Sequence, residues 1–239
     1  YIGFNTSTNL EKDILLRKAI NYAIDREKMM KFLRKNIGYP AVSGLVPNGL
    51  NNDFYSDRYF KNTELANKYL NEYKKINDID NISLDLTTDA QYLDILEFIQ
   101  SELKSLGIDL KINITPPSIL RQGKATGKFN IFRASWIADY ANPENYFSLF
   151  YSKNHTPYGP NYTFFQNEEY DKLYEQTLSL KKKDELNKIY DKLEEIIYEF
   201  SPIIPLYYDM SVRLKQKNIF GLTNNPLNIL DLKTVYKKK

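Results

Sequence analysis

The chain has 239 residues, of which 42% are hydrophobic, 26% charged and 14% aromatic, which is the composition of a globular protein. Its 33 basic and 30 acidic residues leave a net charge of +3, too balanced to indicate nucleic acid or an anionic membrane as a partner. The absence of cysteine excludes disulfides and thiolate metal sites. A globular chain of this length buries about 70–75% of its unfolded surface, enough for a sizeable core.

The chain begins inside a predicted strand, Tyr1–Phe4, without an initiator methionine, a signal peptide or an apolar run of membrane-spanning length. We therefore expect a piece of a longer protein. From Glu11 to about Lys35 the apolar residues recur at helical spacing, and Asp25 is placed to end one helix and cap a second. A loop rich in proline, glycine and asparagine follows over Pro40–Asn52.

The middle of the chain predicts a strand–helix–strand unit. The segments Ile82–Thr87 and Ile108–Ile114 alternate apolar and polar residues with the period of a strand. Between them, Ala90–Leu106 has the spacing of an amphipathic helix, and Gly107 follows at the position that commonly ends one. Two such strands joined by a helix indicate a parallel crossover.

The next predicted strand, Phe129–Trp136, follows a short helix near Ile119–Lys124 and leads into a polar loop. Asn142 then has the character of an N-cap, with Pro143 at the first helical position. Trp136 is therefore predicted to lie where a strand ends. In open α/β folds, ligands gather outside the carboxyl ends of strands.

The last third of the chain predicts two helices and three short strands. The helices cover Glu168–Leu180 and Lys183–Phe200; the strands cover Ile203–Tyr208, Val212–Leu214 and Leu232–Tyr236. Pro205 restricts the first of these strands to a sheet edge or a bulge. No repeat or internal linker divides the chain, so we expect one α/β unit with a partly mixed sheet.

The motifs of the common enzyme classes are absent: no glycine-rich dinucleotide loop, P-loop, nucleophile elbow or HExxH occurs. Ser101 and Lys104 have S-x-x-K spacing but lie mid-helix, without the other motifs of that enzyme class. His155, the only histidine, lies in a polar loop, where an exposed side chain is the ordinary interpretation. Asp139 and Glu144 form a candidate glycosidase-type pair, but Glu144 is better explained as a first-turn residue that favours the helix dipole.

The loop after Phe129–Trp136 places a cation, an aromatic ring and an anion at three-residue spacing, in Arg133, Trp136 and Asp139. Two interpretations stay open from these residues alone. Trp136 is a core residue and Asp139 caps a turn, or the set holds a zwitterionic ligand. In the same way, Tyr207 and Tyr208 end a predicted strand and must face opposite sides of it, which makes either one a candidate to face a cleft.

Five segments occur in an order that is familiar from one protein family. They are Arg17–Glu27 (RKAINYAIDRE), Pro40–Gly49, the W-x-x-D-Y-x-x-P box at Trp136, Asp139, Tyr140 and Pro143, the N-Y and Y-D-K-L segments at Asn161 and Tyr170, and Ile204–Tyr208 (IPLYY). Together they resemble extracellular solute-binding protein family 5, the oligopeptide- and dipeptide-binding proteins of ABC importers. They cover nearly the whole chain, and their order makes the resemblance specific.

The resemblance implies roles for the residues of the loop. In peptide-binding members, the aspartate of the W-x-x-D motif holds the α-ammonium group of the peptide, which points to Asp139. Trp136 and Ile137 then line a side-chain pocket, and Tyr140 faces the ligand beside them. A carboxylate–ammonium pair inside a closed cleft is a strong, short, charge-assisted contact.

The same resemblance implies a carboxylate-binding group. Some oligopeptide binders carry an arginine three residues before the tryptophan, and Arg133 matches it. Lys124 stands at a second basic position that is arginine in those members, and a lysine does not reproduce the bidentate fork of an arginine. One tyrosine of the IPLYY segment also reaches the cleft in some members, hence Tyr207 or Tyr208.

For the fold, the resemblance implies a lobe of a periplasmic binding protein of class II, cluster C, with a mixed sheet flanked by helices. Residues 1–239 then form a single α/β domain, the second ligand-binding lobe of a two-lobe protein. Residues 203–239 return toward the first lobe, which this chain does not include.

For function, the resemblance implies the substrate-binding component of an ABC importer, which is not an enzyme and uses no cofactor or metal. The expected partners are a peptide ligand and the membrane permease. The expected protein is a monomer on the periplasmic or extracellular face of the cytoplasmic membrane, lipid-anchored when complete. The alternatives are a binder of nickel chelates, haem-related ligands or sugars, a hydrolase that uses Asp139 with Glu144 or His155, and a fragment that only packs against a partner.

Overall fold

A five-stranded mixed sheet forms the centre of the protein in a computed structural model that describes residues 1–8, 13–47, 49–50, 58–225 and 229–238. Its strands are β1 (Ile2–Phe4), β3 (Ile82–Thr88), β4 (Ile108–Ile114), β5 (Ile131–Arg133) and β6 (Ile203–Ile204). They lie in the order β4-β3-β5-β1-β6. Strand β3 pairs in parallel with β4 and β5, whereas β1 is antiparallel to β5 and β6. The predicted α/β unit with a mixed sheet is confirmed.

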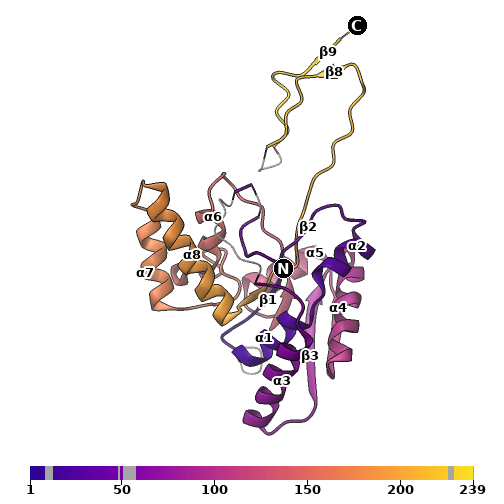
Figure 1. Ribbon diagram of the computed structural model, residues 1–239, viewed down its shortest axis with the longest axis vertical. Helices are drawn as coiled ribbons and strands as arrows, with labels where there is room; N and C mark the ends of the chain where they lie inside the picture. Colours follow the sequence, from indigo (N-terminus) through magenta and orange to yellow (C-terminus); the bar gives the residue numbers. More distant parts are fainter. Residues whose placement is uncertain (9–12, 48, 51–57, 226–228, 239) are drawn as a thin grey trace.

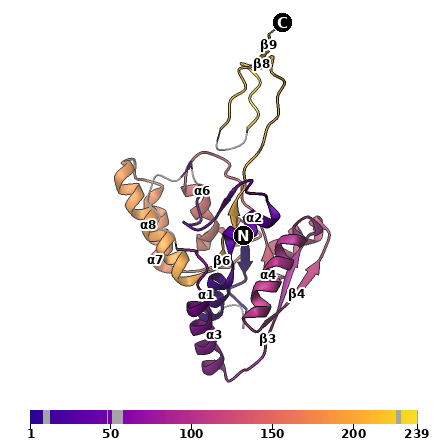
Figure 2. The same cartoon turned by 45° about the vertical axis from the view of Figure 1, so that its right-hand side comes forward.

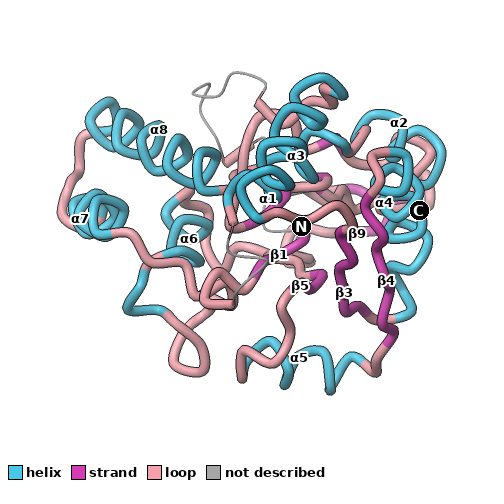
Figure 3. The backbone as a smooth tube through the Cα atoms, turned by 90° about the horizontal axis from the view of Figure 1, so that it is seen from below, coloured by secondary structure: helices cyan, strands magenta, loops and turns pink. Residues whose placement is uncertain are grey.

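Helices flank this sheet on several sides. They are α1 (Ile14–Ala23), α2 (Arg26–Leu33), α3 (Thr63–Asn77), α4 (Leu93–Ser105), α5 (Pro117–Ala125), α6 (Glu144–Phe147), α7 (Glu168–Thr177) and α8 (Lys183–Phe200). Helices α7 and α8 lie together on one side of the body and α4 on the other (Figures 1 and 2). Seen from below, α5 lies past the ends of β3 and β4, opposite α1 and α3 (Figure 3). The carboxyl ends of the parallel strands therefore face α5.

The buried apolar residues form two clusters. One contains the sheet with α1 to α4, and the other contains α6, α7, α8 and the loop residues Leu45 and Val46. The loop between β5 and α6 contributes Ala138 and Trp136 to the second cluster. The candidate loop is thus attached to the side of the protein formed by α6, α7 and α8.

The predicted strand–helix–strand unit is confirmed as β3, α4 and β4. Residues of β3 alternate between buried and exposed from Ile82 to Leu86, as their period of two predicts. The chain enters α4 through a 3₁₀ turn, Ala90–Tyr92, which the Asp89 side chain caps. Gly107 ends the helix with a φ of 83°, a left-handed conformation that favours glycine.

The first predicted helix pair is also confirmed. Asp25 caps α2 by accepting a hydrogen bond from the Lys28 backbone N–H at 2.9 Å. The first helix begins at Ile14 with Asp13 as its cap, later than the predicted Glu11, which lies outside the described residues. Parts of the predicted loop Pro40–Asn52 also lie outside them, at residues 48, 51 and 52.

The strand predicted over Phe129–Trp136 is shorter in the structure, as β5 covers only Ile131–Arg133. The reason lies in its neighbour, because β1 offers three residues for pairing and Arg133 is opposite the first of them, Ile2. Trp136 lies three residues beyond the strand, in the loop. The shorter strand gives the loop more residues than the sequence pattern predicts.

The strand predicted over Ile203–Tyr208 is divided. Its first part is β6, at the edge of the large sheet, and its second part is β7 (Tyr207–Tyr208), which pairs with β2 (Tyr39–Pro40). Pro205 lies at the break, where it offers no N–H to a ladder. The buried Arg26 guanidinium donates to the Pro205 carbonyl oxygen at 2.6 Å and so holds the break in place.

The tail after β7 differs most from its prediction. Val212–Leu214 is not a strand, and the short hairpin of the tail consists of β8 (Ile219–Phe220) and β9 (Tyr236–Lys237), which reaches the predicted Leu232–Tyr236 only at its last residue. We call residues 210–225 and 229–238 the arm. It runs away from the body to the C-terminal end (Figures 1 and 2).

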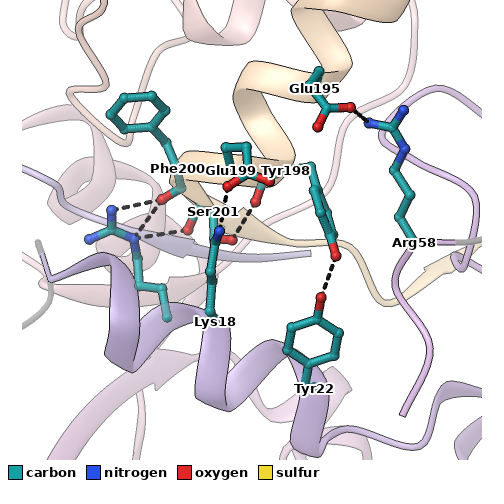
Figure 4. A network of polar contacts seen from close by, with 9 residues as sticks. Lys18, Tyr22, Arg58, Glu195, Tyr198, Glu199, Phe200 and Ser201 are labelled. Carbon is teal, nitrogen blue, oxygen red and sulfur yellow. Dashed lines mark hydrogen bonds and ion pairs between the residues drawn. The ribbon is translucent and has the colours of Figure 1, made fainter. Parts of the chain in front are cut away.

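The end of α8 is tied to α1 by polar contacts (Figure 4). Arg17 donates to the carbonyl oxygens of Phe200 and Ser201 at 2.7–3.1 Å, which satisfies carbonyls that the helix end leaves without partners. Lys18 pairs with Glu199 at 2.5 Å. These contacts position the start of β6, which begins at Ile203, two residues after Ser201.

Candidate functional site

The candidate site lies on the loop of residues 134–143, which connects β5 to α6. Because β3 and β5 are parallel, their carboxyl ends meet at one edge of the sheet. Asp89 and Tyr92 follow β3 there, and Arg133 ends β5. This edge is where open α/β folds bind ligands. The prediction that Trp136 and Asp139 follow a strand end is confirmed.

Side chains of the loop point alternately inward and outward. Trp136 is half-buried and Ala138 is buried, whereas Ile137 is 74% exposed and Asp139 is exposed. Tyr140 is 47% exposed. Within the described part of the chain, the Asp139 carboxylate accepts no hydrogen bond and forms no ion pair. An exposed anion thus lies between two exposed apolar side chains.

Asn145, in the short helix α6, holds the loop from beneath. Its side-chain Oδ1 accepts hydrogen bonds from the indole Nε1 of Trp136 at 2.8 Å and from the backbone N–H of Asp139 at 3.2 Å. Only 5% of Asn145 is exposed. The sequence analysis did not single out this residue, because one asparagine in a first helical turn carries no periodic or motif signal of its own.

Glu144 has a structural role in the same helix. Its two carboxylate oxygens accept hydrogen bonds from the hydroxyls of Tyr140 and Tyr174. Burial, followed by the hydrogen bond to Glu144, raises the pKa of both tyrosines. The Asn142 side chain accepts from the backbone N–H of Glu144 at 3.0 Å, so Asn142 caps the helix as predicted, although α6 begins at Glu144, one residue later than the predicted Pro143. Both carboxylate oxygens of Glu144 therefore already accept a hydrogen bond, and no hydrogen bond joins Glu144 to Asp139 among the described residues.

Positive charge collects at the strand ends. The Arg133 guanidinium carbon lies 3.0 Å from the centre of the Tyr92 ring, a cation–π contact. Burial, followed by the neighbouring charge of Arg133, lowers the pKa of Lys124 to about 8, while Asp89 acts in the opposite direction. No hydrogen bond or ion pair links either cation to Asp139 in the described ranges. The anion and the cations are separate parts of the site.

The paired tyrosines Tyr207 and Tyr208 have different surroundings. Tyr208 is buried, and its hydroxyl donates to the Gly44 carbonyl oxygen at 2.5 Å. Tyr207 is half-buried, and the Arg34 guanidinium carbon lies 5.2 Å from its ring centre. Burial raises the pKa of Tyr207, and the positive charge of Arg133 opposes this shift. Tyr207 is therefore the tyrosine on the side of Arg133.

The other enzyme candidates are joined to no acid–base partner by a hydrogen bond within the described residues. The ring of His155 is half-buried rather than exposed as predicted, because its Nε2 lies 3.0 Å from the Phe165 carbonyl oxygen. Ser101 and Lys104 line a shallow depression on α4, beside Gly107. Across the described residues, no group of three histidine, cysteine, aspartate or glutamate side chains is arranged to hold a metal ion. The described helices also include none that is long and apolar enough to cross a bilayer.

These residues are arranged to recognise a ligand by its charges and its shape. An exposed carboxylate, two exposed apolar side chains and a separate pair of cations match a ligand with an ammonium group, an apolar side chain and an anionic group. Such a ligand is bound by charge-assisted hydrogen bonds. A nucleophile hydrogen-bonded to a general base, which covalent catalysis requires, is not present at these residues.

Comparison with known proteins decides the family. The sequence model of the bacterial extracellular solute-binding proteins, family 5, middle region, matches residues 1–158 of the 239. The chain belongs to this family. The family 5 resemblance that the five sequence segments carry is confirmed, and the match covers the loop with Trp136 and Asp139.

Individual members of family 5 match along nearly the whole chain. The dipeptide-binding protein DppE of Bacillus subtilis (strain 168) is 27% identical over 244 residues, covering 98% of this chain and 44% of DppE. Among solved structures, the Escherichia coli murein tripeptide binding protein MppA has a TM-score of 0.85 at 25% identity, over 100% of this chain and 48% of MppA. The Bacillus subtilis oligopeptide-binding protein AppA in complex with a nonapeptide has a TM-score of 0.82 at 25% identity, over 100% of this chain and 50% of AppA.

These likenesses confirm the fold of a periplasmic binding protein. The chain spans about half the length of the family 5 relatives that it matches. The family consists of solute-binding proteins, and its name places its members outside the cell membrane.

Proposed function

We propose that the complete protein is the peptide-binding component of an ABC importer and that Asp139 binds the α-ammonium group of the peptide. The observation that carries this proposal is the Asp139 carboxylate, which is exposed, has no partner among the described residues and lies on a backbone that Asn145 holds. A carboxylate held in this way is available to an ammonium group. The named relatives, a dipeptide-binding and an oligopeptide-binding protein among them, support a peptide as the solute.

The remaining residues of the site receive roles that follow from their surroundings. Ile137 and Tyr140 line a side-chain pocket with Trp136, since they present apolar surface next to Asp139. Arg133 and Lys124 receive a carboxylate of the peptide. Tyr207, which lies on the side of Arg133, contacts the ligand in preference to the buried Tyr208.

The domain proposal is that this chain is the second lobe of a two-lobe protein. Residues of the arm carry apolar side chains that the body does not cover, such as Val212, Leu214 and Leu230. We infer that they pack against the first lobe, which would close the cleft over Asp139. Closure of two lobes around a ligand is a common way to remove water from a site.

The cellular setting follows from this role. The protein binds a peptide, delivers it to a membrane permease and catalyses no reaction. It acts as a monomer on the periplasmic or extracellular face of the cytoplasmic membrane, where a lipid holds it, and it requires no cofactor.

The test uses the full-length protein and calorimetry with trialanine. Removing one partner of a desolvated ion pair commonly costs about 3–5 kcal/mol, so Asp139→Ala is expected to weaken binding by at least about tenfold. Asp139→Asn, which keeps the shape and removes the charge, should weaken it similarly. N-acetylated trialanine, which lacks the ammonium group, should bind the parent and Asp139→Ala equally weakly.

Two results would contradict the proposal. Equal affinity of Asp139→Ala and the parent for trialanine would remove the ammonium contact. Steady release of alanine from trialanine would identify an enzyme in place of a binding protein. The isolated chain should bind trialanine poorly, because the first lobe is missing from it.

A further inference from the structure

We propose that Asn145 is a positioning residue of the ligand site, which holds the Trp136 ring and the Asp139 backbone in their binding arrangement before the ligand arrives. This inference rests on the proposed peptide-binding function. Asn145 does not touch the ligand, because it is buried beneath the loop. It acts through the two residues that do.

The hydrogen bonds that carry the inference converge on one atom. The indole Nε1 of Trp136 and the backbone N–H of Asp139 both donate to Asn145 Oδ1, at 2.8 and 3.2 Å. An amide oxygen has two lone pairs, so both are in use. Two donors also establish which end of the amide faces them, since the NH₂ group could accept neither.

The loop needs such a contact because it has no regular structure of its own. Residues 135–142 belong to no helix or strand, and the pairing of β5 with the start of the chain ends at Ala134, so a backbone ladder does not order them. Without a holding contact, a ligand would have to order Trp136 and Asp139 when it binds, which reduces affinity. Asn145 meets this requirement with one acceptor that serves both the aromatic and the anionic residue of the motif.

The helix that carries Asn145 is itself well supported. Phe147, the last residue of this helix, is fully buried, and its carbonyl oxygen accepts a hydrogen bond from the Tyr170 hydroxyl of α7 at 2.7 Å. Glu144, which precedes Asn145, accepts hydrogen bonds from the hydroxyls of Tyr140 and Tyr174. The second hydrophobic cluster thereby sets the position of Asn145, and Asn145 sets the position of the loop.

The test compares three variants of the full-length protein. Asn145→Ala removes the acceptor, and Asn145→Asp keeps an oxygen that can accept both hydrogen bonds. Asn62→Ala is the matched control, because Asn62 caps α3 in the other hydrophobic cluster by accepting from the Leu65 backbone N–H at 3.0 Å. Asn145→Ser, with a shorter acceptor, replaces Asn145→Ala should that variant not accumulate.

Two measurements separate a positioning role from a merely structural one. The first is calorimetry with trialanine. The second is ¹⁹F NMR of protein labelled with 5-fluorotryptophan, in which Trp136→Phe identifies the Trp136 resonance. A residue that only stabilises the fold would lower the melting temperature and leave both readouts of the folded protein unchanged.

We expect Asn145→Ala to weaken trialanine binding by at least about fivefold and to shift or broaden the Trp136 resonance. Asn145→Asp should recover most of both effects. Asn62→Ala should lower the melting temperature and change neither readout. Parental affinity, or a parental Trp136 resonance, in Asn145→Ala would overturn the positioning role.

Failure of the proposed function has a different signature. If the parent ignores trialanine, or if Asp139→Ala binds it as the parent does, the ammonium contact is wrong. The Trp136 resonance still decides whether Asn145 holds the loop, since that readout needs no ligand.

Discussion

The Tyr208 hydroxyl donates a hydrogen bond to the Gly44 carbonyl oxygen, 2.5 Å away, and ties β7 to the loop that follows β2. Its neighbour Tyr207 faces the other side of the strand, toward Arg34. Two adjacent tyrosines thus divide two tasks. One anchors the segment through which the chain leaves the body, and the other is half-buried beside Arg34.

This division predicts opposite effects of two similar substitutions. Tyr208→Phe should lower the free energy of unfolding by about 1–3 kcal/mol, because it leaves the buried Gly44 carbonyl without its partner, and should leave trialanine affinity unchanged. Tyr207→Ala should weaken trialanine binding with little loss of stability. Urea unfolding and calorimetry measure the two quantities. A stable Tyr208→Phe with reduced affinity would reverse the assignment.

Glu194 predicts a pH-dependent stability. It is 0% exposed, and its Oε1 accepts from the Leu45 backbone N–H at 3.0 Å and from the Tyr59 hydroxyl at 3.3 Å. Its Oε2 has no hydrogen-bond partner within the described residues. Burial raises the pKa of Glu194 to about 7, against the hydrogen bond from Leu45 and the positive charge of Arg58.

The sign of the effect follows from proton binding. Between the unfolded pKa of 4.5 and the folded pKa of about 7, the folded protein retains a proton that the unfolded chain releases. The contribution of Glu194 is therefore greatest below pH 4.5 and is lost as the pH rises through 7, by roughly 3 kcal/mol in all. Glu194→Gln should remove this loss and be more stable than the parent at pH 8.

The measurement is urea unfolding at pH 5 and pH 8, followed by circular dichroism. Glu195→Gln is the control, because Glu195 is adjacent in sequence but pairs with Arg58 at the surface. It should keep the parental difference between the two pH values. The interpretation is wrong if Glu194→Gln keeps that difference as well.

Lys124 predicts a pH dependence of binding. With a pKa of about 8, its charge is lost in mildly alkaline solution, so affinity for trialanine should fall as the pH rises from 7 to 9. The peptide ammonium also titrates near pH 8, and Lys124→Gln separates the two contributions. Calorimetry on that variant should give a shallower fall, and the amide of trialanine should bind parent and variant alike.

We expect Glu144 to contribute to the stability of the fold and not to catalysis. Glu144→Ala leaves the hydroxyls of Tyr140 and Tyr174 without their acceptor, so we expect a loss of about 2–3 kcal/mol in unfolding free energy. Glu144→Gln should retain part of that stability, since its carbonyl oxygen still accepts. Mass spectrometry of trialanine incubated with the parent should detect no release of alanine. Release of alanine by the parent that is lost in Glu144→Ala would show that Glu144 is catalytic.

Elements with their own local signals could be predicted from the sequence. Asp25 caps α2, and the alternation of Ile82–Thr87 produces β3, because both depend on residues close in sequence. The strand predicted to reach Trp136 ends at Arg133, because its length depends on a partner that lies far away in the chain. Val212–Leu214 has a strand-like pattern but no pairing partner among the described residues.

The candidate site was likewise predictable only where its residues belong to a sequence motif. Asp139, Trp136 and Arg133 belong to a recognisable motif, and the structure places them at the edge that the motif predicts. Asn145 and Tyr92 could not be found, because their importance depends on contacts with residues that the fold brings to them. The choice between Tyr207 and Tyr208 likewise required knowing which side of β7 faces Gly44.

The alternation of the loop has an evolutionary consequence. Ile137 points outward and has no hydrogen bond among the described residues, whereas Asn145 of α6 holds the Asp139 backbone and Glu144 holds the Tyr140 side chain. Under the proposed function, mutations at Ile137 change which solutes are accepted at little cost to folding. A site arranged in this way can diversify its preferences one exposed residue at a time, and a library randomised at Ile137 alone is the natural starting point for altering them.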